Sequence, residues 1–368
     1  MNPDFLKFLG AKPEDRRDAF LGAARRLGTP EQNIEKDFWV TWTLDVLFNG
    51  LPSAHPRLLF KGGTSLSKAY GLISRFSEDI DITVFREDLG QAASIEELES
   101  LSRKKREARL DAIKIACREY IQKTLLAQFE INVLAALAAS GIEVNDPMVV
   151  VSPDDPDGQS LLFWYPSVTT AKDDYIRPAV KIEAGAKSAL DPHQDLTIRA
   201  YVSDELPRLS LSAANVTTVD AERTFWDKVI ILHGVRKWFE NRGVLRHQGQ
   251  RVSRHYYDVH QMLQSELRTR VAGDRTLAAD CAAHARMFFN NPSLGLDTAA
   301  HGNFSLTPIG GMAEELRRDY SRMAGMVVGL APGFEDVMAS IASLEAELNQ
   351  TKKGDPASRI PLSNSAKN

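Results

Sequence analysis

Apolar side chains recur at three- and four-residue intervals along residues 14–49, which is the spacing of an amphipathic helix. Pro30 interrupts this pattern, and because proline is tolerated in the first turn of a helix but not in its interior, we expect two helices here. Residues 95–140 are rich in Glu, Lys, Arg, Leu and Ala and predict one or two long helices. Residues 220–348 are mostly helical by composition, with breaks near 290–292 and 308–311 where Asn, Pro and Gly gather.

Short apolar runs in the first half of the chain have the composition of strands. Residues 57–61 form one run that ends at two glycines, as a buried strand does where it enters a tight turn, and a helix is expected over residues 65–72. Residues 80–85 are β-branched and alternate, so a strand is expected there too. Further strands are predicted over residues 147–151, 160–168 and 178–184, with a turn of Pro, Asp and Gly between the first two.

The order of these elements predicts an α+β fold, because helices and strands occur in separate blocks. We expect an N-terminal helical cap over residues 1–50, an α/β core over 51–215 and a helical C-terminal lobe over 216–350. At 368 residues the chain is long enough for two lobes, since single cores stop growing near about 250–300 residues. Residues 351–368 bury too few apolar groups to recover their ordering entropy, so a flexible tail is expected.

Overall composition indicates a soluble, folded protein of a reducing compartment. Hydrophobic residues make up 43% and charged residues 26% of the chain, which is ordinary for a globular protein. The two cysteines, Cys117 and Cys281, cannot build a disulfide framework and lack metal-ligand spacing. No signal peptide is recognisable and no apolar run reaches the ~20 residues that span a bilayer, so we expect a cytoplasmic protein without membrane association.

The formal net charge of −4 argues against a protein that coats nucleic acid, yet two local basic patches exist. Residues 101–123 carry eight basic residues against three acids, and a solvated helix face explains them as well as a binding face does. Residues 236–254 carry six basic residues against Glu240 alone, which is too few acids for an ordinary helix face. We therefore expect the second patch to contact phosphates, with a polyanionic acceptor held by Arg246, Arg251 and Arg254.

The most informative stretch begins with a Gly-Gly turn. Gly62 and Gly63 leave backbone N–H groups uncovered, and the helix that follows has a partial positive charge at its N-terminus, so a triphosphate fits against this turn. The hydroxyls of Thr64 and Ser65 add potential donors. The turn therefore predicts a phosphate-binding site.

Two aspartates, Asp79 and Asp81, open the strand that follows. Because side chains alternate along a strand, both carboxylates point to one side while the isoleucines between and after them point to the core. Like charges this close repel one another, and a divalent cation, Mg²⁺ or Mn²⁺, is their usual partner. Mg²⁺ also bridges phosphate oxygens and lowers the pKa of an attacking hydroxyl, as nucleotidyl transfer requires. An Asp-x-Asp pair alone is weak evidence, but after a Gly-Gly-Thr turn it is far more specific.

These motifs resemble those of the AbiEii/AbiGii and MenT group of nucleotidyltransferase toxins, within the DNA polymerase β-like nucleotidyltransferase superfamily. Four segments match in the family's order between about residues 60 and 260. The first is the Gly-Gly-Thr turn with Ser77-Glu78-Asp79-Ile80-Asp81-Ile82, and the second is Val180-Lys181-Ile182-Glu183. The third is Glu222-Arg223-Thr224-Phe225-Trp226-Asp227-Lys228, and the fourth is Ser253-Arg254-His255-Tyr256-Tyr257-Asp258. The first is the most specific. The resemblance implies a mixed-sheet core of the nucleotidyltransferase type.

The resemblance also implies roles for individual residues. The expected catalytic residues are Asp79, Asp81, Lys181 and Asp227. Nucleotide binding is expected from Gly62, Gly63, Thr64, Ser65, Lys68, Lys181 and Lys228. The family's fourth motif often has an acidic residue where His255 stands, so Asp258 is the better match to it.

Reasoning from the residues leaves several assignments open. Lys181 and Glu183 share a face of their strand, either as a phosphate-binding lysine with a third metal carboxylate or as a surface salt bridge. Asp227 either acts in the site or pairs with a basic neighbour. His233 and the Tyr256-Tyr257 pair lie in helical segments where a buried core position is commoner than a ligand contact.

Together these observations predict an enzyme that moves a nucleoside monophosphate from a nucleoside triphosphate (NTP) and releases pyrophosphate. The resemblance further implies a toxin of a toxin–antitoxin or phage-defence pair. Its acceptor is then RNA, with the tRNA 3′ end preferred, and a cognate antitoxin is encoded beside it. Two alternatives stay open: transfer to a hydroxyl of a protein or small molecule, and a nucleotide-binding regulator without turnover.

Overall fold

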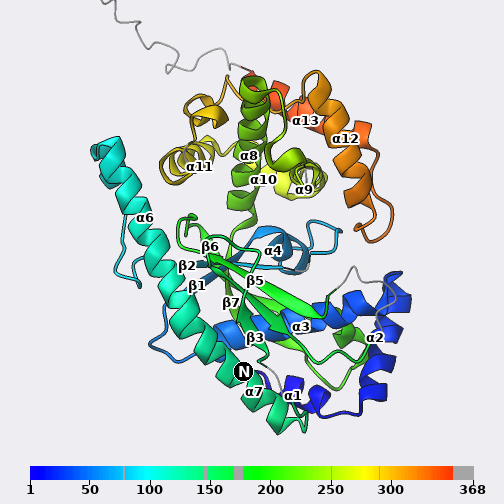
Figure 1. Cartoon of the computed structure of the whole chain (residues 1–368). Helices are drawn as coiled ribbons and strands as arrows, with labels where there is room; N and C mark the ends of the chain where they lie inside the picture. Colours follow the sequence, from blue (N-terminus) through cyan, green and yellow to red (C-terminus); the bar gives the residue numbers. More distant parts are fainter. Residues whose placement is uncertain (78, 145–146, 170–176, 250, 290, 351–368) are drawn as a thin grey trace, which may run out of the picture.

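The computed structural model describes residues 1–77, 79–144, 147–169, 177–249, 251–289 and 291–350. A mixed seven-stranded sheet with surrounding helices forms one lobe, the sheet lobe, and the helices from α8 (Ala221–Arg242) onward form a second, the helical lobe (Figure 1). The α+β class predicted from the sequence is confirmed. The predicted tail over residues 351–368 lies outside the described residues.

The strands run in the order β3-β4-β5-β2-β1-β7-β6 across the sheet. β2 is antiparallel to β1 and parallel to β5, and β1 is parallel to β7. The strands predicted from the sequence are confirmed as β1 to β5, except that β4 ends at Trp164 and not at the expected residue 168. The bounds are β1 (Leu58–Lys61), β2 (Ile80–Val84), β3 (Val149–Val151), β4 (Ser160–Trp164), β5 (Ala179–Gly185), β6 (His193–Arg199) and β7 (Ser212–Val219).

β6 and β7 are not predicted by the sequence pattern. β6 lies at the edge of the sheet with most of its side chains exposed, and β7 is built largely of Ser, Ala, Asn and Thr. Apolar alternation, the usual sign of a strand, is therefore weak in both. They pair with each other in an antiparallel manner, with an irregularity between Leu196 and Ile198. The short helix η2 (Tyr201–Glu205) lies in the connection between them.

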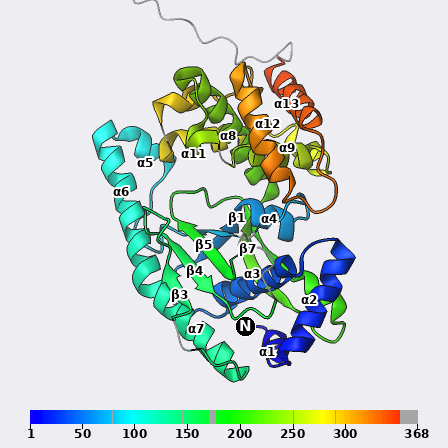
Figure 2. The same ribbon diagram turned by 45° about the vertical axis from the view of Figure 1, so that its right-hand side comes forward.

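Three helices begin the chain: α1 (Pro3–Leu9), α2 (Pro13–Leu27) and α3 (Glu31–Asn49). The predicted break is confirmed, because α2 is followed by Gly28 with a left-handed φ of 66° and Pro30 immediately precedes α3. α3 packs against β5 and β7 (Figure 2). Its tryptophans are buried and lie against Phe163 of β4. These helices therefore share a hydrophobic core with the sheet.

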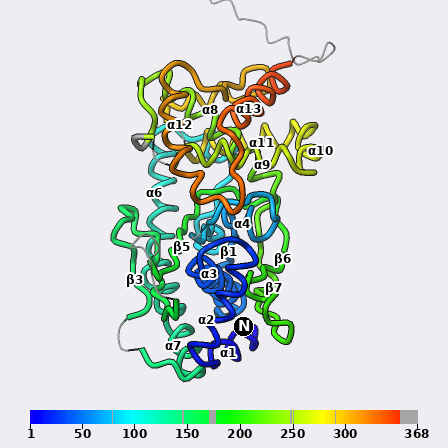
Figure 3. Tube along the Cα trace, turned by 90° about the vertical axis from the view of Figure 1, so that its right-hand side faces the viewer, coloured from blue at the N-terminus to red at the C-terminus, as the bar shows by residue number. Residues whose placement is uncertain are grey.

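The helix after β1 lies where the two lobes meet (Figure 3). This helix, α4 (Gly62–Lys68), starts directly at the first glycine and ends earlier than the 65–72 span expected from the sequence. Leu66 of α4 and Ile73 just beyond it belong to the core of the helical lobe, although they come from the first part of the chain. The turn that precedes the two aspartates is thereby fixed against both lobes.

A long helical rod runs along the sheet lobe and reaches the helical lobe (Figure 1). After α5 (Ile95–Ser100), it consists of α6 (Arg103–Glu119), the π-helical turn η1 (Tyr120–Leu125) and α7 (Leu126–Ala139), which confirms the long helices predicted here. α5 packs against α11 (Arg275–Phe288), and Arg286 of α11 pairs with Glu99 of α5 at 3.2 Å. This contact connects the two lobes a second time.

The helical lobe has its own hydrophobic core. The lobe comprises α8, η3 (Arg246–Gly249), α9 (Ser253–Leu263), α10 (Leu267–Val271), α11, η4 (Pro292–Leu294), η5 (Leu296–Thr298), α12 (Gly311–Ala324) and α13 (Phe334–Asn349). His233 is fully buried, contacts the Gly295 carbonyl oxygen at 3.1 Å and accepts from the Ser305 N–H, so its assignment to the core is confirmed. Tyr256 and Tyr257 are likewise fully buried.

The hydrophobic cores show which of the predicted parts of the chain pack together. Residues 1–50 share their core with the sheet, and the boundary expected after residue 215 falls inside β7. We propose that the division lies at Asp220, between β7 and α8. Among the described residues, no helix has both the length and the apolar character needed to cross a membrane.

Candidate active site

A cavity of about 1120 Å³ lies between the two lobes. The ends of β1 and β5, the start of β2 and the first turns of α6 contribute side chains from the sheet lobe, and α8, α9 and the segment after α11 contribute from the helical lobe. The predicted site residues that line it are Gly62, Gly63, Asp79, Asp81, Glu183, Asp227, Lys228, Arg246 and Arg254. The predicted site residues outside its lining are Thr64, Ser65, Lys68, Lys181 and Arg251.

The two glycines are needed because two side chains approach them closely. Gly62 has a φ of +82°, and a Cβ at this position would overlap Oδ2 of Asp81. A Cβ at Gly63 would overlap Nη2 of Arg75. Only glycine allows this left-handed turn and this approach, so the motif places one carboxylate and one guanidinium directly against its backbone.

Asp81 stands in the middle of a row of three charged side chains that crosses neighbouring strands. It lies opposite Lys61 of β1 and opposite Glu183 of β5. Residues directly opposite on adjacent strands present their side chains to the same face of a sheet. All three line the cavity, as does Asp79 just before β2, whereas the isoleucines of β2 are fully buried. The carboxylates therefore face the cavity together.

The surroundings of Asp81 disfavour its negative charge. Burial raises the pKa of this carboxyl, and the nearby carboxylate of Glu183 adds to the effect. The positive charges of Lys61, Arg254 and Lys228 oppose the shift without cancelling it. A further cation next to Asp81 would therefore stabilise the ionised form.

Thr64 and Ser65, for which the sequence predicts donation to a phosphate, instead hold the turn together. Both are fully buried. The Thr64 hydroxyl donates to the Asp79 carbonyl oxygen and lies 2.8 Å from the Ser77 hydroxyl. The Ser65 hydroxyl donates to the Gly62 carbonyl oxygen at 2.9 Å. Because both hydroxyl protons are engaged inside the protein, these residues position the turn and Asp79.

Lys68, expected to bind nucleotide, lies away from the cavity. Its ammonium group forms an ion pair with Asp37 of α3, and the two side chains are only 3% and 2% exposed. It also donates to the Arg199 carbonyl oxygen at 2.8 Å and lies 4.1 Å from the centre of the Tyr201 ring. The turn of α4 carries Lys68 away from the glycines, so it links α4 to α3 and is not available to a ligand.

Lys181 and Glu183 form the ion pair that their spacing allows. Glu183 lines the cavity and Lys181 does not. Although burial disfavours the ammonium charge, Glu183, Asp79 and Asp155 together raise the pKa of Lys181. Lys181 is therefore a charged group outside the lining of the cavity, and its closest partner is Glu183.

Asp258 of α9 gathers two cations beneath the cavity. Its fully buried carboxylate accepts from Nε and Nη2 of Arg75 at 2.7 and 2.9 Å, and lies 2.9 Å from Nζ of Lys228. Burial opposes ionisation, yet the two cations hold the pKa of Asp258 well below its usual range. The sequence does not predict Arg75, because a single arginine in a connecting segment gives no periodic signal.

Asp227 of α8 both pairs with a basic neighbour and faces the cavity. Its carboxylate lies 3.4 Å from Nε of Arg223, and the side chain remains 43% exposed. Although the side chain opens into the cavity, the protein packed around it removes much of its water and raises the pKa of Asp227, while Arg223 and Lys61 oppose that shift. The pairing alternative left open by the sequence is thus confirmed, without removing Asp227 from the cavity.

The three arginines expected to hold an acceptor do not all lie at the cavity. Arg254 lines the cavity and its charge acts on Asp81. Arg246 also lines the cavity and lies 5.5 Å from the Trp238 ring. Arg251 is exposed outside the cavity, and its backbone N–H donates to Asp319 at 2.9 Å. Only two of the three arginines expected to hold an acceptor therefore reach the cavity.

His255 lines the cavity at the position where the family often has an acid. Burial, together with the positive charges of Lys228 and Arg254, lowers the pKa of His255 far below its usual value. Its ring is therefore neutral at physiological pH. Nδ1 is buried and has no hydrogen-bond partner in the described part of the chain.

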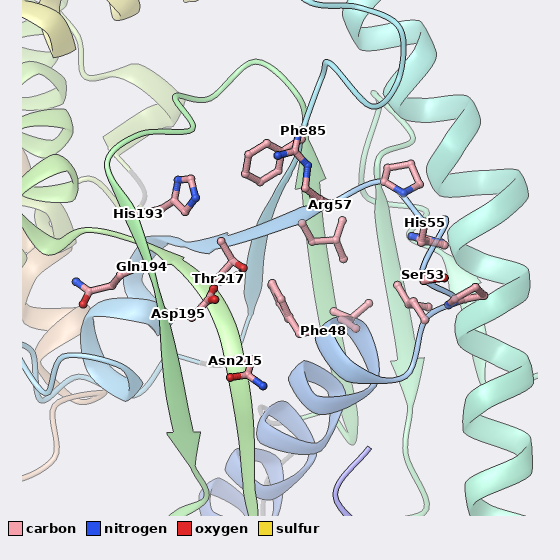
Figure 4. A pocket seen from close by; sticks show the side chains of 15 residues that line it. Phe48, Ser53, His55, Arg57, Phe85, His193, Gln194, Asp195, Asn215 and Thr217 are labelled. Carbon is pink, nitrogen blue, oxygen red and sulfur yellow. Dashed lines mark hydrogen bonds between the residues drawn. The ribbon is translucent and has the colours of Figure 1, made fainter.

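A second cavity of about 540 Å³ lies beside β6, β7 and the end of α3 (Figure 4). Several of its polar side chains are engaged with other protein groups: Thr217 donates to Asp195 at 2.8 Å, and Arg57 pairs with Asp88 at 2.9 Å while lying over the Phe85 ring. None of the predicted site residues lines it. We therefore place the candidate active site between the lobes.

The carboxylates of the site suit a cation that is only partly held by protein. Among the described residues, no three His, Cys, Asp or Glu side chains are grouped as a complete metal site. Mg²⁺ is commonly bound through one or two carboxylates, with substrate phosphates and waters as its other ligands. Asp79 and Asp81 line the cavity beside the Gly62-Gly63 turn, and a cation next to Asp81 would stabilise its ionised form. The residues therefore fit Mg²⁺ or Mn²⁺ bound together with a nucleotide.

A mixed sheet that presents a carboxylate pair beside a Gly-Gly turn, with a helical lobe facing it, defines a protein of the nucleotidyltransferase class. A family model described as "Nucleotidyl transferase AbiEii toxin, Type IV TA system" matches residues 45–340. The chain belongs to this family and is a nucleotidyltransferase toxin of a type IV toxin–antitoxin system.

The fold is also similar to that of MenT4, the nucleotidyltransferase toxin Rv2826c from Mycobacterium tuberculosis H37Rv. The two chains are 16% identical, the match covers 89% of this chain and 97% of that chain, and the TM-score is 0.41. No curated protein matches this chain.

Proposed function

We propose that this toxin transfers a nucleoside monophosphate from an NTP to a hydroxyl of an RNA acceptor and releases pyrophosphate. The observation that carries the proposal is the row of Lys61, Asp81 and Glu183 at the Gly62-Gly63 turn. It places carboxylates for a cation next to the two glycines, and all of these residues line one cavity. A cavity of about 1120 Å³ is large enough for a nucleotide and part of an acceptor.

Mg²⁺ or Mn²⁺, when bound by Asp79 and Asp81, would supply charge that stabilises the phosphates as negative charge develops. The protein's own groups orient the triphosphate. Lys228 and Arg254 face the carboxylates from the helical lobe and provide point charge and a planar fork for phosphate oxygens. Asp258 holds Lys228 in place, since the buried ion pair leaves that ammonium little freedom.

The family resemblance and the basic side chains at the cavity support a nucleic-acid acceptor. We propose the tRNA 3′ end as the acceptor, a cognate antitoxin as the opposing partner and action in the cytoplasm, where NTPs and tRNA occur together. A role in phage defence is part of the same proposal. Arg246, which lines the cavity, is the arginine proposed for acceptor phosphates; of the other two that the sequence pattern predicts, Arg254 is assigned to the NTP and Arg251 lies outside the cavity.

The test is incubation of total RNA with the protein and each of the four labelled NTPs, followed by mass spectrometry of the RNA. One NTP is expected to label RNA in the wild type, with release of pyrophosphate, and the double variant Asp79→Ala/Asp81→Ala is expected to show neither. Label on a protein or small molecule would favour the alternative acceptor class. NTP binding without pyrophosphate release would favour a regulator.

A further inference from the structure

The cavity continues beyond the carboxylates, along α8 towards the end of α11. Lys228 lies at the carboxylate end, whereas Ile231 and Val235 line the cavity further along the same helix. At 1.5 Å per residue, Val235 lies about 10 Å beyond Lys228. Leu294 and Leu296 complete an apolar wall there. This part of the cavity, which we call the distal branch, is therefore separate from the place proposed for the triphosphate.

An exposed aromatic ring, Phe289, lines the cavity five residues before Leu294 of the apolar wall, and we include it in the distal branch. Phe289 directly follows α11 and is 45% exposed, although Phe288 beside it is 1% exposed and packed into the core of the sheet lobe. Nζ of Lys187 lies 5.3 Å from the centre of the Phe289 ring, and both residues line the cavity. A ring exposed in this way offers a face for a nucleobase, and stacking of this kind tolerates every base.

Lys187 forms no ion pair with a carboxylate in the described part of the chain, although the charges of Asp157 and Asp111 act on it. Burial and the positive charge of Lys114 lower its pKa more than these two carboxylates raise it, so its surroundings disfavour the ammonium charge. The charges that act most on Asp81 are instead those of Lys61, Glu183 and Arg254. The cation in the distal branch is thus separate from those beside the carboxylates.

Two arginines of α6 face the same cavity from the opposite lobe. Arg106 donates from Nε to the Leu98 carbonyl oxygen at 2.9 Å, which fixes its guanidinium at the end of α5. Arg103 is mostly exposed and pairs with Glu107. Lys104 and Lys105 lie on the same turn but do not line the cavity. The first basic patch therefore presents only part of its charge to the distal branch.

We infer that the distal branch binds the unpaired terminal nucleotides of the RNA acceptor, with one base stacked on Phe289 and the phosphates contacted by Lys187, Arg103 and Arg106. This inference rests on the proposed function. An aromatic platform next to cations is the arrangement that proteins use for single-stranded nucleic acid. The base of the NTP is the other base able to stack on Phe289. The triphosphate of that NTP, however, is assigned to the turn, Lys228 and Arg254 at the carboxylate end of the cavity.

The test compares Phe289→Ala, Phe289→Tyr and Arg103→Gln/Arg106→Gln with the control Lys104→Gln/Lys105→Gln, which removes equal charge from the same turn. Binding is measured by anisotropy of a short labelled single-stranded RNA, and the KM for NTP separately. Phe289→Ala should weaken RNA binding about 5- to 150-fold, the cost of losing one stacked base, and Phe289→Tyr should restore it. The KM for NTP should not change.

The salt dependence of binding adds a second readout. Removing one cation that neutralises a phosphate of single-stranded RNA should reduce the slope of log affinity against log salt by about 0.7, so Arg103→Gln/Arg106→Gln should reduce it by about 1.4. The control Lys104→Gln/Lys105→Gln should keep the wild-type slope. A fully paired RNA should compete poorly with the labelled single-stranded RNA.

Three results would overturn the inference: a Phe289→Ala variant whose KM for NTP rises while RNA binding is normal, a control that loses as much affinity as the arginine variant, or equal competition by paired RNA. Absence of transfer by the wild type to any RNA would refute the proposed function itself. Normal transfer and RNA binding by Phe289→Ala would refute the distal branch alone.

Discussion

The Asp258 carboxylate accepts two hydrogen bonds from the Arg75 guanidinium, at 2.7 and 2.9 Å, across 183 positions of the chain. Arg75 lies shortly before the two aspartates of the site, whereas Asp258 belongs to α9 of the helical lobe. Arg75 also fills the space that a side chain at position 63 would need. The pair therefore fixes the Gly-Gly turn against the helical lobe.

Asp258→Asn is expected to destabilise the whole protein. The variant leaves Arg75 and Lys228 buried with no carboxylate between them, and removing one partner of a buried ion pair typically costs about 3–5 kcal/mol. Urea unfolding measures the change in the free energy of unfolding. A decrease below about 1 kcal/mol would mean that the cations find another partner.

The pH dependence of stability gives an independent check of the same ion pairs. Because the pKa of Asp258 is depressed in the folded protein, its contribution is fully present above the unfolded pKa of about 4 and declines as the pH falls below that value. The wild type should therefore lose more stability than Asp258→Asn as the pH is lowered from about 5 to about 2. Parallel pH profiles for the two proteins would contradict the assignment.

Gly62→Ala is expected to abolish activity, because a Cβ there displaces the Asp81 carboxylate. Gly71→Ala is the matched control: Gly71 also has a left-handed φ, of +62°, but no atom lies within 4 Å of a Cβ there. Both variants should lose about 1–2 kcal/mol of stability from backbone strain. Pyrophosphate release should disappear only in Gly62→Ala, and equal activity of the two variants would show that the close approach is unimportant.

The sequence predicts the strands with apolar alternation and the long helices, because burial of one face imposes a period that a single chain reveals. It does not predict β6, because an edge strand with few buried side chains has no such period, or β7, because its Ser, Ala, Asn and Thr residues give little apolar alternation. The sequence also does not predict which distant segments α6 lies beside in the fold. Periodicity shows that Arg103 and Arg106 belong to a helix, but the lobe they face depends on packing between distant segments.

Within the site, the spacing of Asp79 and Asp81 is sufficient to predict that both face one cavity. The sequence assigns the hydroxyls of Thr64 and Ser65 to a ligand because their internal acceptors, backbone carbonyls, are invisible in a sequence. Lys68 is assigned to the nucleotide for its closeness to the turn along the chain. Its partner Asp37 comes from another helix, and only the fold brings them together.

Asp81→Asn should reduce the rate of pyrophosphate release at least about a hundredfold, because a preorganised electrostatic group is removed from the site. The fold should be retained, since burial already disfavours the Asp81 charge and a neutral amide relieves it. Thermal unfolding without metal should thus give a Tm equal to or above that of the wild type. Asp195→Asn, which removes a carboxylate in the second cavity, should leave turnover unchanged.

Lys68→Met should lower stability without changing the KM for NTP. The substitution leaves Asp37 buried and unpaired, at a cost of about 3–5 kcal/mol. Adding Asp37→Asn should recover part of this decrease, because no unpaired charge then remains. Lys61→Met provides the contrast: Lys61 lines the cavity, so its removal should raise the KM for NTP. A raised KM in Lys68→Met at unchanged stability would return Lys68 to the nucleotide site.

Single substitutions of Arg246, Arg251 and Arg254 by Gln should separate three roles that the sequence does not distinguish. Arg254 acts on Asp81 from within the cavity, so Arg254→Gln should raise the KM for NTP. Arg246 lines the cavity but is exposed beside Trp238, so Arg246→Gln should leave that KM unchanged.

Arg246→Gln should instead weaken RNA binding and reduce the slope of log affinity against log salt by about 0.7–0.9, the effect of one fewer neutralised phosphate. Arg251 lies outside the cavity, and its backbone N–H alone bonds to Asp319, so Arg251→Gln should change neither quantity and serves as the control for the removed charge. If all three variants reduce the salt slope equally, the patch over residues 236–254 binds RNA as one surface. The distinction between arginines inside and outside the cavity is then wrong. If none does, the RNA acceptor is held elsewhere.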